Sequence, residues 1–260
     1  MGHERIGRLP RTVVWRQIVG ALKTAASGTD AEIVRVAALT INQVRTRFRA
    51  IHNDTGVQAA FGFLVAIARD QLPTCIGRAA PEISFPSEAA PLRLAVAVNE
   101  WVNANAQSLE YAELAKRAAA ETLAEWHRDK TRQIGLFASS PSISSREAWL
   151  AASSGAGFSE LSRLFLSRFT ERYLRYFLER EASSVIRNIE EREKFTERLH
   201  DSINLISQHA FETSRIAQSF AAGWYNKYAR NQTPPNTRLS GFLRVAFGKI
   251  QEELRREAAS

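Results

Sequence analysis

Hydrophobic residues recur every three or four positions through most of the chain, the spacing that places them on one face of an α-helix. Residues 10–27 carry such a face between an initial proline and Gly28, two residue types that favour the start and the end of a helix. The face consists of Val14, Ile18 and Leu22. No segment shows the alternation of polar and β-branched residues that a half-buried strand needs. The pattern therefore predicts an all-α protein.

The first 130 residues are expected to form one helical bundle. A second helix follows Asp30, and its apolar face continues to Ile51. Residues 57–72 are apolar on more than one side, which is typical of a helix at the centre of a bundle. Four prolines predict an irregular stretch over residues 73–91. Helices are expected again at 92–102 and 109–130.

A second bundle is predicted for residues 146–260. Residues 131–145 end in a serine-rich run and are expected to form a linker or an exposed loop. Ser144 and Glu147 have the spacing of a capping box for a short helix that Gly155 to Gly157 would end. From Phe158 to about Arg230 the helical pattern is almost continuous, so long antiparallel helices are expected. The fold class is thus two packed helical bundles, 1–130 and 146–260.

The last helix, at about 238–256, follows the helix-breaking pair Pro234 and Pro235 and carries a strongly apolar face. This face consists of Leu239, Phe242, Leu243, Phe247, Ile250 and Leu254. A face of this size is a liability in water, so it must be buried. It could fold back on its own bundle, dock a partner or second subunit through Leu239, Phe242, Phe247, Ile250 and Leu254, or lie on a membrane surface.

Positive charge is concentrated at the two ends of the chain, whose net charge is +8. Residues 1–54 hold nine Lys or Arg against four acids, and residues 223–260 hold seven against three. Clustered cations attract anionic partners, so nucleic acid or an acidic protein is the expected partner, within a protein complex. The excess of arginine over lysine fits a GC-rich bacterial genome.

One cysteine, Cys75, permits neither an internal disulfide nor a thiolate cluster for zinc, which fits a reducing cytoplasm. No apolar run approaches the roughly 20 residues needed to cross a bilayer, so integral membrane association is not expected. Glu197 and His200 form one Glu-x-x-His step of the kind used in di-metal bundles, but a second step is missing. No metal site and no cofactor are predicted.

Two segments combine aromatic and cationic residues, as surfaces that bind single-stranded nucleic acid do. Residues 224–230 contribute Trp224, Tyr225, Lys227, Tyr228 and Arg230, and this segment is predicted either to bind nucleic acid or anions, or to be an ordinary solvated face. The other segment places Arg168, Arg172 and Arg175 on one helix face. Glu171 and Glu179 flank that face and can pair with it, so a solvated face is favoured there over a nucleic-acid platform.

Arg45 and Arg49 form part of a basic helix near His52, and they are candidates for anion or nucleic-acid binding. The spacing of Arg45 and His52 resembles the signature of HEPN ribonuclease domains, which are small helical bundles. The resemblance implies that the arginine would hold the scissile phosphate and that the histidine would help to transfer protons. On a continuous helix the two residues, seven positions apart, share a face.

The sequence leaves three functional hypotheses. The leading one is a non-enzymatic binding or scaffold subunit of a bacterial assembly, engaging nucleic acid or an acidic partner through its basic ends. The second is a metal-independent ribonuclease centred on Arg45 and His52. The third is a peripheral membrane protein that uses the apolar face of its last helix.

Overall fold

The computed structural model describes residues 12–44, 48, 50–71, 90–107, 111–135, 141–212, 215–257 and 259. Within these ranges the chain is helical and contains no strand, so the predicted all-α class is confirmed. The helices are α1 (Val13–Ser27), α2 (Asp30–Gln43), α4 (Thr55–Ala68), α5 (Pro91–Asn105), α6 (Ala112–Gly135), α7 (Pro141–Leu150), α8 (Gly155–Val185), α9 (Ile189–Glu212), α10 (Arg215–Trp224) and α11 (Asn236–Glu257). Three short turns, η1 (Ile51–Asn53), η3 (Ala151–Ser153) and η4 (Tyr225–Ala229), join or extend them.

Side-chain caps set the first residue of three helices. Thr12, Asp54 and Ser154 precede α1, α4 and α8, and the side-chain oxygen of each accepts a hydrogen bond from the backbone N–H three residues later. The distances are 3.0, 3.0 and 2.9 Å. Each cap satisfies one of the N–H groups that a helix start leaves without an intrahelical partner. The start of α1 at Val13 lies three residues after the predicted start at residue 10, which is outside the described residues.

The predicted linker at 131–145 is largely helical, which corrects the expectation. Helix α6 continues to Gly135 and α7 begins at Pro141, while residues 136–140 lie outside the described part. Because α7 begins at Pro141, Ser144 lies inside the helix and does not cap it. The glycines at 155 and 157 also differ from the prediction. They form the first turn of α8, behind the Ser154 cap, and do not end the preceding helix.

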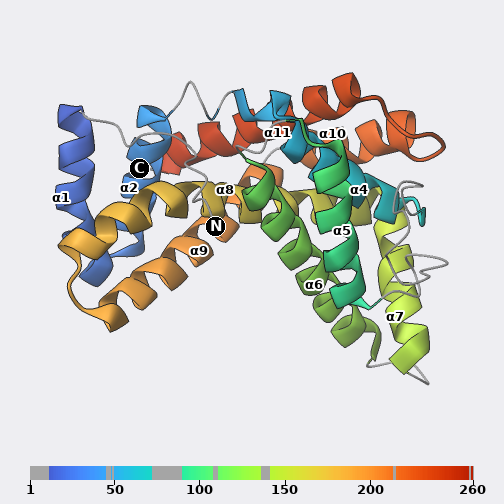
Figure 1. The fold of residues 1–260 in the computed structure, drawn as a ribbon, viewed down its shortest axis with the longest axis horizontal. Helices are drawn as coiled ribbons and strands as arrows, with labels where there is room; N and C mark the ends of the chain where they lie inside the picture. Colours follow the sequence, from blue (N-terminus) through green and yellow to red (C-terminus); the bar gives the residue numbers. More distant parts are fainter. Residues whose placement is uncertain are drawn as a thin grey trace.

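Helix α8 runs through the middle of the molecule (Figure 1). It contacts α1 and α2 near one end of the fold and α4, α6 and α10 toward the other, and α9 packs back along it after a short connection. Helix α11 crosses the top of the same view and contacts α2, α4, α9 and α10. Segments far apart in sequence therefore meet on both sides of α8.

The buried apolar residues form one continuous core to which both predicted bundles contribute. Phe61 of α4 illustrates the join, because its ring centroid lies 5.8 Å from that of Phe165 in α8 and 4.9 Å from that of Phe242 in α11. Helices before and after residues 131–145 thus share a core. The division into two bundles at residues 131–145 stays a prediction. Core contacts join helices from both sides of that boundary.

The apolar face of α11 lies inside this core. Leu239, Phe242, Phe247, Ile250 and Leu254 are each less than 5% exposed. The helix has therefore folded back on its own chain, and these five residues are not a docking surface in this arrangement, which corrects that alternative. No described helix has both the length and the apolar character needed to span a bilayer.

Candidate nucleic-acid interface

The candidate interface is built around a π-helical turn at the end of α10. In η4 the N–H of Arg230 donates to the carbonyl oxygen of Tyr225 at 2.8 Å, an i to i+5 hydrogen bond. Such a turn holds one more residue than an α-helical turn, so it changes which side chains face inward. Tyr225 and Ala229 are buried, whereas Lys227 and Arg230 are exposed.

Trp224 and Tyr225 belong to the core and not to the surface, so the structure does not present them as base-stacking residues. Trp224 is 6% exposed, and its ring centroid lies 4.9 Å from that of Phe242. Tyr225 is 1% exposed, stacks on Phe158 at 4.6 Å, and donates its hydroxyl hydrogen to the carbonyl oxygen of Ala68 at 2.8 Å. Both side chains attach the end of α10 to its neighbours.

Three of the five predicted residues reach the surface, and together with Arg238 we call them the C-terminal basic patch: Lys227, Tyr228, Arg230 and Arg238. The half-buried ring of Tyr228 is the centre of the patch. Lys227 Nζ lies 5.1 Å and Arg238 Cζ 4.5 Å from the centroid of that ring, within the range of cation–π attraction. Arg238 comes from the first turn of α11, so the patch joins residues on both sides of the Pro234 and Pro235 turn.

The cations of the patch are placed to attract an anionic partner. Lys227, Arg230 and Arg238 are all exposed, and none of them forms an ion pair with a carboxylate of the described residues. The first turn of α11 contains no acidic residue. An approaching anion therefore meets three cations and the positive end of a 22-residue helix.

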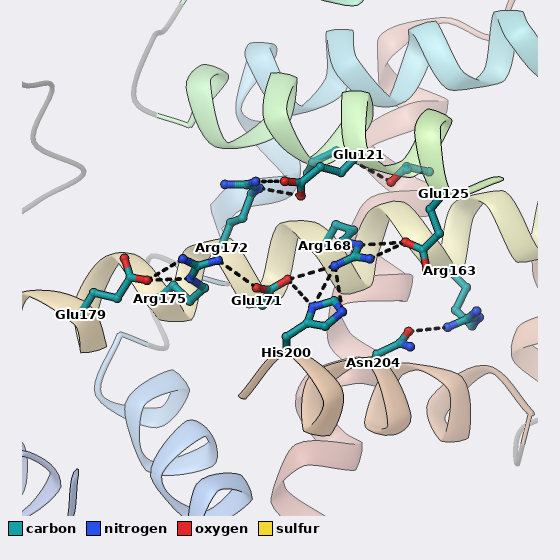
Figure 2. Close-up of polar contacts among 12 residues, drawn as sticks. Glu121, Glu125, Arg163, Arg168, Glu171, Arg172, Arg175, Glu179, His200 and Asn204 are labelled. Atoms are coloured by element: carbon teal, nitrogen blue, oxygen red, sulfur yellow. Dashed lines mark hydrogen bonds and ion pairs between the residues drawn. The ribbon is translucent and has the colours of Figure 1, made fainter. Parts of the chain in front are cut away.

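The other predicted arginine face is used inside the protein (Figure 2). Arg168 donates to Glu125 of α6 from Nε at 2.9 Å and from Nη2 at 2.6 Å, and Arg172 donates to Glu121 of the same helix. Their side chains are only 19% and 18% exposed. The arginines thus hold α8 against α6. Pairs with Glu171 and Glu179 are present, but the face packs against a second helix, which corrects the predicted solvated face.

Glu171 is the most buried carboxylate of this network, with a side chain 5% exposed. Its Oε2 accepts a hydrogen bond from His200 Nδ1 of α9 at 2.8 Å, and its Oε1 lies 3.3 Å from Arg175 Nη1. Burial by itself raises the pKa of Glu171, but the hydrogen bond and charge of His200, with Arg175 and Arg168, outweigh burial and hold the pKa below its ordinary value. The charged network ties α6, α8 and α9 together.

The structure describes only one of the two residues behind the ribonuclease hypothesis, His52. Arg45 and Arg49 lie outside the described residues, so their predicted binding roles are not placed. Helix α2 ends at Gln43, and His52 lies half-buried in the short turn η1. Phe48 and Ala50 are helical and Phe48 N–H donates to the carbonyl oxygen of Val44 at 3.0 Å, but Arg45 is not described, so a shared face for Arg45 and His52 stays a prediction.

Glu197 and His200 line a surface groove of about 450 Å³ between α8 and α9. Among the residues that the structure describes, no three His, Cys, Asp or Glu side chains are grouped to hold a metal ion. Comparison with protein-family models, curated proteins and solved structures gives no match, so function has to be inferred from the residues themselves.

Proposed function

We propose that this chain is a non-enzymatic binding protein that contacts nucleic-acid phosphates through the C-terminal basic patch. The observation that carries the proposal is the set of three exposed cations, Lys227, Arg230 and Arg238, without a carboxylate partner in the described part of the chain. By contrast, the cations of the Arg168 network are neutralised by neighbouring acids. Unpaired cations grouped on one surface are the footprint of a phosphate-binding face.

The chemistry of the patch favours contact with the nucleic-acid backbone over reading of bases. Tyr228 is the only ring of residues 224–230 that reaches the surface, and Lys227 and Arg238 already lie against it. Base stacking is therefore a minor contribution, and charge supplies most of the affinity. We expect binding that is nearly independent of sequence and falls steeply with salt.

A triple variant tests the patch: Lys227→Ala, Arg230→Ala and Arg238→Ala together. The matched control removes three cations that already have acidic partners, Arg128→Ala, Lys194→Ala and Lys249→Ala, so the change in net charge is the same. Affinity for a single-stranded oligonucleotide is measured by fluorescence anisotropy over a series of salt concentrations.

The patch variant should reduce the slope of log affinity against log salt by about 2, since each lost phosphate contact removes roughly 0.7 from a single-strand slope. The control should keep most of the slope. Equal losses in both variants would show that diffuse net charge, not the patch, attracts the strand. Binding of an acidic protein in place of an oligonucleotide, or binding that ignores salt, would also reject the proposal.

No observation favours the other two hypotheses. The ribonuclease hypothesis depends on Arg45, which lies outside the described residues. The membrane hypothesis depended on a free apolar face on α11, and that face is buried.

A further inference from the structure

A cavity of about 250 Å³ lies between α4, α5 and the first turn of α11. Its apolar walls come from small and aliphatic side chains of α4, such as Val65 and Ala66, and from Leu239 of α11. Polar side chains line the remainder. A small concave site with an apolar wall and a few converging polar groups is the usual form of a ligand pocket.

Trp101 supplies an aromatic wall for this cavity. Its indole Nε1–H donates to the carbonyl oxygen of Ala59 at 3.0 Å, which fixes the ring against α4. The side chain is half-buried, so part of the ring is free to contact a ligand. A flat, fixed ring favours a flat, unsaturated ligand.

Four carboxamide side chains also line the cavity: Gln58, Gln71, Asn105 and Asn236. Gln58 is 7% exposed, and its Nε2 donates to the carbonyl oxygen of His52 at 2.8 Å. Its Oε1 accepts no hydrogen bond from the described residues, so this oxygen is available to a ligand. Asn105 is likewise held by one bond, from its Nδ2 to the carbonyl oxygen of Trp101 at 2.8 Å. Both amides are thus oriented with hydrogen-bonding capacity left for a ligand.

Among the described residues that line the cavity, Arg69 is the only charged one. Its Nη1 donates to Thr233 Oγ1 at 2.8 Å. Burial outweighs the opposing effect of the nearby Tyr225 and lowers the pKa of Arg69 below its ordinary value. No carboxylate contributes to this shift. The first turn of α11 begins at the cavity with Asn236 and carries no acid. One side of the cavity is therefore suited to an anion.

We propose that this cavity binds a nucleotide, with the base between Trp101 and the carboxamides and the phosphate on Arg69. A simple organic acid would need the cation and the apolar wall but not four carboxamides. A nucleobase needs them, because its edge presents donors and acceptors side by side, and Asn and Gln match that pattern with two hydrogen bonds. The site is distinct from the C-terminal basic patch, whose proposed contacts are to a strand's phosphates.

Three probes test the proposal on the full chain by isothermal titration calorimetry: AMP, adenosine and ribose 5-phosphate. AMP should bind most tightly. Adenosine lacks the phosphate and should bind at least about tenfold more weakly, the effect of one lost hydrogen bond to a charged group. Ribose 5-phosphate lacks the base, and the loss of stacking on Trp101 should weaken its binding by at least about tenfold as well. Ribose 5-phosphate binding as tightly as AMP would show a plain anion site and overturn the proposal, as would the absence of AMP binding at millimolar concentration.

Two substitutions separate the halves of the site. Arg69→Met should weaken AMP at least about tenfold while leaving adenosine unchanged, and Arg69→Lys should restore part of the loss because it keeps the charge. Ala66→Leu places a larger side chain in the cavity and should abolish binding of AMP and adenosine alike. Unchanged AMP affinity in either Arg69→Met or Ala66→Leu, with a native melting transition, would reject the site.

The same phosphate and base could belong to a free nucleotide or to the 5′ end of a strand. Competition of AMP by a 5′-phosphorylated oligonucleotide, but not by its 5′-hydroxyl form, identifies a strand end, and failure of both to compete identifies a free nucleotide. The patch variant Lys227→Ala, Arg230→Ala, Arg238→Ala should keep its AMP affinity. Loss of salt-dependent strand binding and loss of AMP binding are therefore separate results.

Discussion

The packing of α11 into the core makes a quantitative prediction for Phe242→Ala. Phe242 is 1% exposed and lies at the centre of an aromatic cluster. Its ring centroid is 4.9 Å from that of Phe61, 5.5 Å from that of Phe220 and 4.9 Å from that of Trp224. A fourth ring, that of Phe158 in α8, lies 6.0 Å away, so truncation to alanine removes four ring contacts and leaves a cavity where four helices meet.

The expected cost is about 3–5 kcal/mol, the usual range for Phe to Ala in a core. A cost at the low end would require the cluster to collapse, which is opposed because its members belong to four separate helices, α4, α8, α10 and α11. A loss of this size is a large part of the roughly 5–15 kcal/mol that stabilises a typical domain. It should lower the melting temperature by roughly 6–20 °C.

Val245→Ala is the matched control, since Val245 lies on the same helix and is 38% exposed. It should change the free energy of unfolding by no more than about 0.5 kcal/mol. Both variants are compared by denaturant titration followed by circular dichroism, with size-exclusion chromatography at two concentrations. If Phe242→Ala unfolds like the control but elutes as a smaller species, α11 serves an interface between chains and the packing argued above is refuted.

Two further predictions concern buried polar groups. Glu171→Gln should destabilise the chain by about 1.5–3 kcal/mol at neutral pH, the value of a hydrogen bond to a charged group. Because the pKa of Glu171 is held below its ordinary value of 4.5, its contribution is present above that pH and is lost as the pH falls further, so the variant and the native chain should converge in acid unfolding below pH 4.5. A difference that persists there would contradict the ionic role. Tyr225→Phe should cost about 0.5–1.5 kcal/mol through the lost bond to Ala68, whereas Tyr228→Phe should cost less than about 0.5 kcal/mol; equal effects in thermal melts would argue against the buried hydrogen bond.

Much of the helical architecture follows from sequence periodicity. The stop at residues 231–236 and the apolar face of the last helix could be predicted, because proline lacks an amide hydrogen and because a one-sided apolar pattern has to be buried. Helix starts were less predictable. Thr12 and Ser154 act as caps because the backbone is extended at each of them, and residue spacing does not reveal that conformation.

The candidate surface at residues 224–230 was predicted only in part, because its exposed side chains depend on a π-helical turn, which holds one more residue than an α-helical turn. An α-helical pattern for residues 224–230 leaves open which side chains face the core. The π-helical hydrogen bond from Arg230 to Tyr225 decides it, since it places Tyr225 inside and Lys227 outside. Nothing in the residue types of this segment distinguishes a π turn from an α turn, so tertiary packing determines the outcome.

Arg238 was missed for a different reason. It belongs to the next helix, and the turn at Pro234 and Pro235 brings it to the ring of Tyr228. This arrangement affects the mode of binding that can be expected from the patch. A ring with a lysine and an arginine against it offers little surface to a base, but the two cations are held in place and directed outward. Recognition through such a patch should follow the spacing of phosphates along a strand, and it should therefore depend on salt and strand length much more than on base sequence.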